Sequence, residues 1–205
     1  MRASSSIIPT SVIVAAAASP SGFEVSAPSQ ALPELAADDF TLFELPRRFA
    51  QSAADIDTRW KDLLRQAHPD RFAAQGSAAQ RVAMQWSVRI NEAHQRLKDP
   101  LKRAAYLCEL QGAPIEAENN MAMPAAFLMQ QMGWREALDE TPVLAALEQL
   151  HDEVMQARRE TLQACESLLD VQQDAPAAAQ HVRSLMFIER FLRDVETRMD
   201  SMDPR

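Results

Sequence analysis

The tripeptide His68-Pro69-Asp70 joins an imidazole and a carboxylate through a proline, whose ring restricts the backbone between them. Lys61 and Arg65 precede it four residues apart, so the two cations share one face if that segment is helical. A fixed carboxylate beside a positive surface suits docking on an acidic protein, with Asp70 engaging a basic residue there. Arg71 follows directly and is assigned to the same surface. The pattern predicts a protein-docking site.

Nothing in the sequence resembles a nucleophile–base pair or an oxyanion site, so we do not expect an enzyme or any catalytic residue. His94, His151 and His181 stand at neither ligand nor catalytic spacing and are expected to be solvated or to cap helices. Cys108 and Cys165 are too isolated for a disulfide framework or a zinc site. Cys108, in the apolar run Tyr-Leu-Cys, is expected to be buried and inert. We therefore predict no metal and no cofactor, and a reducing cytoplasm as the compartment.

An amphipathic helix is predicted to lead into the tripeptide. Ser52 can cap it, and Asp55 suits the positive end of the helix dipole. Its apolar face is formed by Ile56, Trp60, Leu63, Leu64 and Ala67. The helix should end at His68, because Pro69 lacks an N–H group and disfavours helical geometry in the residue before it.

A second amphipathic helix is predicted over Ala78–Lys98, after a polar loop through Gly76. Its apolar stripe is formed by Val82, Trp86, Ile90, Ala93 and Leu97. Two apolar stripes joined by a loop predict an antiparallel hairpin with the tripeptide at its turn.

The rest of the chain is also predicted to be helical. Before the hairpin, Phe40–Pro46 is expected to form a short turn; after it, Asp99-Pro100 ends the second helix and a shorter one covers Leu101–Leu110. A linker, residues 111–123, leads to three further amphipathic helices. These run from Pro124 to about Glu140, from a Thr141 cap and Pro142 to about Gln172, and from an Asp174 cap to about Met199. With only 4 Gly and 1 Tyr in 205 residues, the composition favours an all-α protein that ends in a three-helix bundle.

Charge is distributed unevenly along the chain. Residues 41–110 hold 12 Lys and Arg against 8 Asp and Glu, whereas residues 111–205 hold 8 against 17. A basic half and an acidic half suggest two different protein partners and make nucleic acid an unsuitable partner for the whole molecule. There is no run of 18 apolar residues, so no membrane span is predicted.

Residues 1–37 are rich in Ser, Ala and Pro and are predicted to be a disordered tail, or a product of an upstream start codon. The apolar run Ile7–Ala18, with Arg2 before it, leaves a cleaved signal peptide as the alternative. Pro9 interrupts that run, and no disulfide chemistry follows it.

The predicted helix that starts at Pro124 carries two apolar stripes. Phe127, Trp134 and Leu138 share one face, which suits the core of the bundle. Leu128, Met129 and Met132, continued by Glu136 and Glu140, form a second stripe on nearly the opposite face. This stripe is either an exposed interaction patch or the second side of a helix sandwiched within the bundle. Periodicity alone does not decide between them.

Several runs resemble the HscB family of iron–sulfur J-domain co-chaperones. They are Phe40-Thr-Leu-Phe-Glu-Leu-Pro46, Trp60-Lys-Asp-Leu-Leu-Arg-Gln-Ala-His-Pro-Asp70 and Phe127-Leu-Met-Gln-Gln-Met-Gly-Trp-Arg-Glu-Ala-Leu-Asp-Glu140. A further run, Ile90-Asn-Glu-Ala-His-Gln-Arg-Leu-Lys-Asp-Pro-Leu-Lys-Arg-Ala-Ala-Tyr106, resembles the latter part of a J domain. The resemblance covers residues 38–200. It implies a J domain over residues 38–112, packed in an L shape on a three-helix domain over residues 113–205.

The resemblance also implies two partners. The J domain would stimulate ATP hydrolysis by an HscA-type chaperone through the tripeptide and its basic neighbours. The bundle would bind the iron–sulfur scaffold IscU through Leu128, Met129, Met132, Glu136 and Glu140, together with the aromatic Phe187 of the last helix, for which a core role is the alternative. Gly133 departs from the family, which often has an acidic residue there, and it weakens the helix by up to about 1 kcal/mol.

Two rival functions are considered. A J-domain protein could serve a different client, and the Leu128, Met129 and Met132 stripe is the feature that discriminates between this function and scaffold binding. A structural helical adaptor with a degenerate J domain is the other, and an intact His68-Pro69-Asp70 argues against it.

Overall fold

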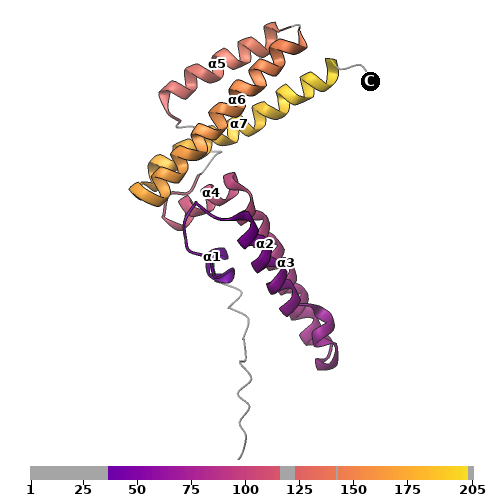
Figure 1. Cartoon of the computed structure of the whole chain (residues 1–205). Helices are drawn as coiled ribbons and strands as arrows, with labels where there is room; N and C mark the ends of the chain where they lie inside the picture. The colour runs from indigo at the N-terminus through magenta and orange to yellow at the C-terminus, as the bar shows by residue number, and fades with distance from the viewer. Residues whose placement is uncertain (1–36, 116–122, 142, 203–205) are drawn as a thin grey trace, which may run out of the picture. The chain divides into compact units, whose positions relative to one another are not determined.

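A computed structural model describes residues 37–115, 123–141 and 143–202 of the chain. Within these ranges it contains seven α-helices, one 3₁₀ helix (η1) and one π-helix (η2), and no strand (Figure 1). The elements are α1 Asp39–Leu42, α2 Ala53–Gln66, η1 Pro69–Gln75, α3 Ser77–Lys98, α4 Pro100–Leu110, α5 Ala125–Glu140, α6 Leu144–Glu166, η2 Ser167–Gln172 and α7 Ala175–Met202. The predicted all-α class is confirmed. The predicted tail, except Ala37, and most of the predicted linker lie outside the described residues.

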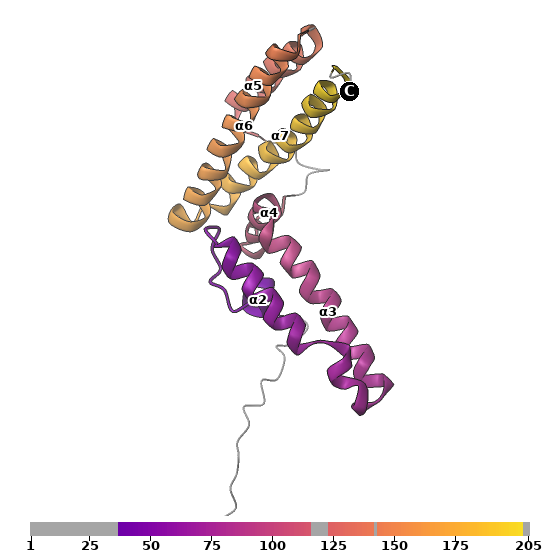
Figure 2. The ribbon, with the colours of Figure 1, turned by 45° about the vertical axis from the view of Figure 1, so that its right-hand side comes forward.

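Helices α2 and α3 lie side by side as the predicted antiparallel hairpin (Figure 2). Ser52 caps α2 as expected, because its hydroxyl accepts a hydrogen bond from the backbone N–H of Asp55 at 3.3 Å. The predicted stripes supply the buried side chains of the hairpin, among them Ile56, Leu63 and Ile90. Among the described residues, every helix is too short or too polar to span a lipid bilayer.

Two details of the hairpin differ from prediction. Val82 is half exposed (50%), and Ala83 is buried in its place (2%). At about 100° per residue, both lie roughly 50° from the centre of the stripe, so periodicity could not choose between them. The N-terminal part of α3 packs against η1, and the side of the helix that carries Ala83 is the buried one there. The predicted loop after His68 is largely the 3₁₀ helix η1, which ends at Gly76 with a φ of +94°.

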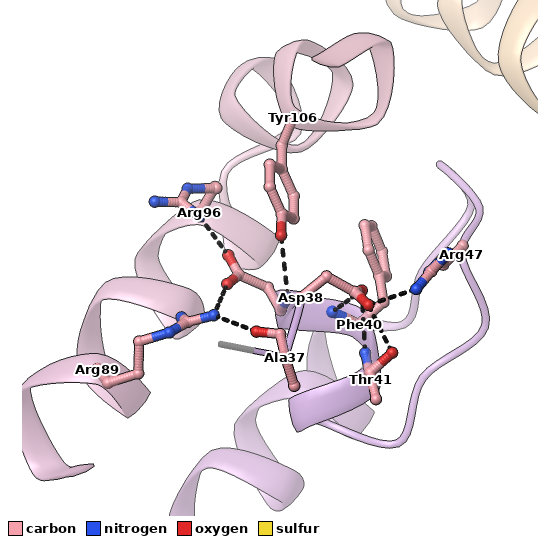
Figure 3. A network of polar contacts seen from close by, with 9 residues as sticks. Ala37, Asp38, Phe40, Thr41, Arg47, Arg89, Arg96 and Tyr106 are labelled. Carbon is pink, nitrogen blue, oxygen red and sulfur yellow. Dashed lines mark hydrogen bonds and ion pairs between the residues drawn. The ribbon is translucent and has the colours of Figure 1, made fainter. Parts of the chain in front are cut away.

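The segment predicted as a turn before the hairpin, Phe40–Pro46, overlaps the short helix α1, which is held by polar contacts (Figure 3). The carboxylate of Asp38 caps it by accepting hydrogen bonds from the next helical N–H groups, and Asp39 is fully buried. Arg89 and Arg96 of α3 approach the Asp39 carboxylate at 2.6 and 2.9 Å. The Tyr106 hydroxyl of α4 accepts a hydrogen bond from the Asp39 N–H at 3.1 Å. Four helical residues are thereby fixed on two other helices.

Helices α5, α6 and α7 form the predicted bundle. One core cluster of the bundle consists of Phe127, Trp134, Leu150, Val154, Ala157, Ile188, Phe191, Leu192 and Val195. Leu138 is partly buried and packs against this cluster, so the predicted inward stripe of α5 is confirmed. The domain boundaries and the L-shaped packing that the family resemblance implies stay predictions.

The ends of the bundle helices were predicted less well. Pro124 caps α5 and is not its first residue. Thr141 does not cap α6: it follows the end of α5, where its hydroxyl donates to the carbonyl oxygen of Ala137, and α6 begins after Val143. Asp174 does cap α7, because its carboxylate accepts a hydrogen bond from the Ala177 N–H at 3.0 Å.

Candidate functional site

The tripeptide lies at the junction of α2 and η1 and is open to solvent. The side chains of His68 and Asp70 are 58% and 91% exposed. His68 caps η1, since its Nδ1 accepts a hydrogen bond from the Asp70 N–H at 3.3 Å, and Pro69 is the first residue of η1. The Asp70 carboxylate oxygen is 3.6 Å from His68 Nδ1. The turn therefore presents a carboxylate to an approaching partner from a backbone fixed by a cap and a proline.

The predicted cations lie on the same stretch of chain. Lys61 and Arg65 are exposed on α2, and Arg65 pairs with Asp62 at 3.0 Å. Arg71 Nη1 donates a hydrogen bond to the carbonyl oxygen of Arg65 at 3.2 Å, which ties η1 to the last turn of α2. Five of the six predicted docking residues are thus exposed on residues 61–71, and Pro69 is half-buried. The structure also gives Arg71 a local structural contact that the sequence did not reveal.

A polar cluster that the sequence reasoning missed joins the two helices of the hairpin. His94 is only 14% exposed and its Nε2 lies 2.7 Å from an oxygen of Asp57, so the expectation of a solvated or capping histidine is wrong. Lys98 Nζ approaches the same carboxylate at 3.0 Å, and Trp60 Nε1 donates to Asn91 at 2.9 Å. In the sequence, Asp57 and Trp60 are three residues apart, and Asn91, His94 and Lys98 are three and four apart, beside the apolar stripes. This spacing is the only sequence signal that could have indicated the cluster.

The second stripe of α5 faces away from the core. Leu128 is 40% exposed, Met129 73% and Met132 64%, and Glu136 and Glu140 are exposed as well. A helix sandwiched on both sides, the alternative that periodicity left open, is therefore not what the structure shows. An apolar surface continued by free carboxylates is the kind of patch that binds another protein.

Phe187 of α7 belongs partly to the core and partly to the surface. Its ring packs edge to face on Phe127 and stacks on Phe191, with centroid separations of 5.7 and 5.9 Å. Arg135 of α5 places its guanidinium 5.3 Å from the Phe187 ring centroid. The ring borders an open groove of about 550 Å³ between α5 and α7, lined also by Arg135, Leu138, Asp139, Arg190, Phe191 and Asp194.

The thiols and the remaining histidines form no reactive site. Cys108 and Cys165 are unpaired and fully buried, and burial raises their pKa values to about 11 and about 12. His151 is 3.8 Å from a Glu196 oxygen, and burial lowers the pKa of His181. Across the described ranges, no group of three or more His, Cys, Asp or Glu side chains could hold a metal ion.

A helical hairpin with an exposed His-Pro-Asp turn, together with a three-helix bundle that exposes an apolar and acidic stripe, defines a helical protein with two candidate surfaces for protein docking. A family model described as the HSCB C-terminal oligomerisation domain matches residues 123–196. The "Co-chaperone protein HscB homolog" of Bordetella petrii is 48% identical over 163 residues, which are 78% of this chain and 96% of that protein. The homolog of Burkholderia multivorans is 47% identical over 167 residues, 80% of this chain and 95% of that protein.

Two solved structures agree with this assignment. The chaperone HscB from Vibrio cholerae is 33% identical and superimposes with a TM-score of 0.70, covering 82% of this chain and all of that one. The human co-chaperone protein HscB is 26% identical with a TM-score of 0.71, covering 82% of this chain and 83% of that one. The chain belongs to the HscB co-chaperone family, which confirms the resemblance drawn from its sequence.

Proposed function

We propose that this chain is a cytoplasmic, non-enzymatic co-chaperone in iron–sulfur protein maturation. It binds a scaffold protein of the IscU type, delivers it to an HscA-type ATP-driven chaperone and stimulates the ATPase of that chaperone. The observation that carries the proposal is the pair of exposed surfaces on different helices of a member of the HscB family. One is the His68-Pro69-Asp70 turn with its cations, and the other is the Leu128, Met129 and Met132 stripe.

The first surface is suited to a partner that offers both acidic groups and a basic residue. Lys61 is exposed and 74% of the Arg65 side chain is open to solvent, so both can meet carboxylates of the chaperone. Asp70, held out by the capped turn, can then form a charge-assisted hydrogen bond with a basic residue. Because these groups lie at the surface, their attraction should weaken as salt rises.

The second surface combines apolar anchors with negative charge. Methionine side chains are flexible and polarizable, so Met129 and Met132 can adapt to the shape of a partner. Glu136 and Glu140 continue the stripe and favour a partner with basic groups at the edge of its own apolar patch. A few apolar anchors usually supply most of the binding energy at such an interface.

A different client for the same co-chaperone is the second candidate. Gly133, where the family often has an acidic residue, lies on the exposed side of α5 next to Met132. Compared with family members that have an acidic residue at this position, the stripe of this chain has one carboxylate fewer. This difference favours a client with fewer basic groups than the IscU-type scaffold.

The test uses the purified chain with the ATPase chaperone and the scaffold. The wild-type chain should stimulate ATP hydrolysis, and added scaffold should raise the stimulation further. Asp70→Asn should abolish stimulation while the helical circular dichroism spectrum and scaffold binding persist. Stimulation by Asp70→Asn at the wild-type level would contradict the docking assignment. Failure of the wild-type chain to bind the scaffold would favour the second candidate, a co-chaperone for a different client. Dimers in sedimentation would show instead that the stripe binds a second copy of the chain.

A further inference from the structure

One carboxylate of the C-terminal bundle holds the backbone that leads into α2. Asp170 lies in η2, at the turn between α6 and α7. Its two oxygens accept hydrogen bonds from consecutive backbone N–H groups, those of Phe49 at 2.6 Å and Ala50 at 2.8 Å. The donors and the acceptor are more than 100 residues apart, since the two bonds span 121 and 120 positions. A charged acceptor makes both bonds stronger than ordinary amide contacts.

The segment that Asp170 holds has no regular structure to support it. Residues 45–52, between α1 and α2, are neither helical nor paired in a strand. Phe49 is nevertheless 5% exposed, and the guanidinium of buried Arg103 lies 5.0 Å from its ring centroid. Arg103 belongs to α4, which also packs against α7 and η2. Phe49 of the α1–α2 segment is therefore contacted from two sides, by Asp170 of the bundle and by Arg103 of α4.

The backbone that carries Asp170 is irregular. The six residues of η2 are wound as a π-helix, a form that is rare and often found at functional positions. Gln173 then adopts the left-handed conformation, with a φ of +55°, and its side-chain amide donates to the carbonyl oxygen of Leu169 at 2.7 Å. A non-glycine residue in this conformation is strained, and such strain persists only where surrounding contacts hold it.

We propose that Asp170 is a positioning residue that couples the two docking surfaces. By holding the amides of Phe49 and Ala50, it fixes the start of α2, the helix that carries Lys61 and Arg65, against the turn from which α7 begins. A scaffold bound to the bundle is then presented in one orientation to the chaperone docked on α2. This inference rests on the proposed function, because it concerns the part of ATPase stimulation that requires the scaffold.

Asp170→Asn tests the inference in the full chain, with Asp174→Asn as the matched control four residues away. Asparagine has nearly the same side-chain shape as aspartate but only one oxygen acceptor, which is uncharged. Its NH₂ group is a donor, so it cannot accept the hydrogen bond of the second backbone N–H. Asp174 caps α7 through the Ala177 N–H, and among the described residues it has no hydrogen bond or ion pair to the α1–α2 segment. Asparagine caps helices about as well as aspartate. Both variants lose the same charge. Asp170→Glu keeps both acceptors and should restore part of the effect.

Two readouts are expected to separate the variants, and two others are expected to stay unchanged in both. Hydrogen exchange at the Phe49 and Ala50 amides should be about ten- to a hundredfold faster in Asp170→Asn and unchanged in Asp174→Asn. The extra ATPase stimulation by scaffold should largely disappear in Asp170→Asn only. Scaffold affinity and stimulation without scaffold should equal the wild-type values in both.

Wild-type coupling in an Asp170→Asn chain whose two amides exchange rapidly would overturn the inference and leave the proposed function intact. Absence of scaffold binding by the wild-type chain would overturn the proposed function and, with it, the coupling role of Asp170.

Discussion

The imidazole of His94 stacks on the indole of Trp60, with ring centroids 4.5 Å apart and ring planes inclined by 18°. This contact joins α3 to α2 beside the apolar stripes, and each ring also has a polar partner on the opposite helix, Asp57 for His94 and Asn91 for Trp60. His94→Ala removes the stack and one hydrogen bond, so urea unfolding should show a loss of about 1–2 kcal/mol. His151→Ala, which removes a more exposed histidine, should change the unfolding free energy far less. Equal losses in both variants would contradict this account.

The acid stability of the hairpin should depend on Asp57. Hydrogen bonds from His94 and then from Lys98 lower the pKa of the Asp57 carboxyl below its ordinary value. A depressed native pKa means that the ionised group stabilises the fold above the unfolded pKa of about 3.9, and that this contribution is lost as the pH falls through the native value. Asp57→Asn should flatten the dependence of the unfolding free energy on pH below about 4, measured by urea titrations at several pH values. An unchanged slope there would show that Asp57 does not contribute.

Replacing the exposed stripe of α5 should separate binding from folding. The triple change Leu128→Ala, Met129→Ala and Met132→Ala removes side chains that are 40–73% exposed, so the thermal midpoint should stay close to that of the wild type. Scaffold binding, measured by calorimetry, should fall sharply. Phe127→Ala on the same helix is the control, because this ring is 7% exposed and its loss should cost about 3–5 kcal/mol of stability. A folded triple mutant with wild-type scaffold affinity would refute the site.

Gly133 should be replaceable with a gain in stability. It lies inside α5, and a Cβ atom added there would meet no heavy atom within 4 Å. Gly133→Ala should therefore stabilise the chain by about 0.5–1 kcal/mol and raise the melting temperature by roughly 1–4 °C. Gly112→Ala should do the opposite and cost about 1–2 kcal/mol, because Gly112, just after the C-cap of α4, has a φ of +79°. Calorimetric melting of the two variants would reveal whether the signs differ as expected.

The two thiols should be inert in the native chain. Burial raises their pKa values to about 11 for Cys108 and about 12 for Cys165, above the unfolded value of about 8.5. Their neutral forms therefore contribute stability that is complete below pH 8.5 and is lost as the pH rises through the native pKa values. At pH 8 an aromatic disulfide reagent should modify both thiols rapidly in denaturant and hardly at all in buffer. Fast modification in buffer would show that the thiols are accessible.

Features set by neighbouring residues could be predicted from the sequence. Ser52 and Asp174 were identified as caps, and Asp99-Pro100 as a helix boundary, because a cap acts over about three residues. The exposed stripe of α5 followed from helical periodicity, although only the structure showed that nothing in the described bundle covers it.

Features set by distant residues could not be predicted. His94 meets Asp57 over 37 positions, and Asp170 meets Ala50 over 120. A single sequence carries no pattern that pairs side chains over such separations. Thr141 was misassigned for a related reason. Its hydroxyl could serve either the helix after it or the one before it, and it bonds the carbonyl oxygen of Ala137 in the preceding helix.

The anchoring of α1 determines when this part of the chain can fold during synthesis. Phe40, Leu42 and Phe43 are almost completely buried, yet the Tyr106 hydroxyl that bonds the Asp39 N–H lies 67 positions later. At 5–20 residues per second, the ribosome needs about 3–13 s to make that stretch. For that interval two phenylalanines and a leucine have no completed core to enter. Helix α1, which is synthesised before α2, α3 and α4, is therefore not held in place until α4 has been made, and until then the newly made chain exposes this apolar segment.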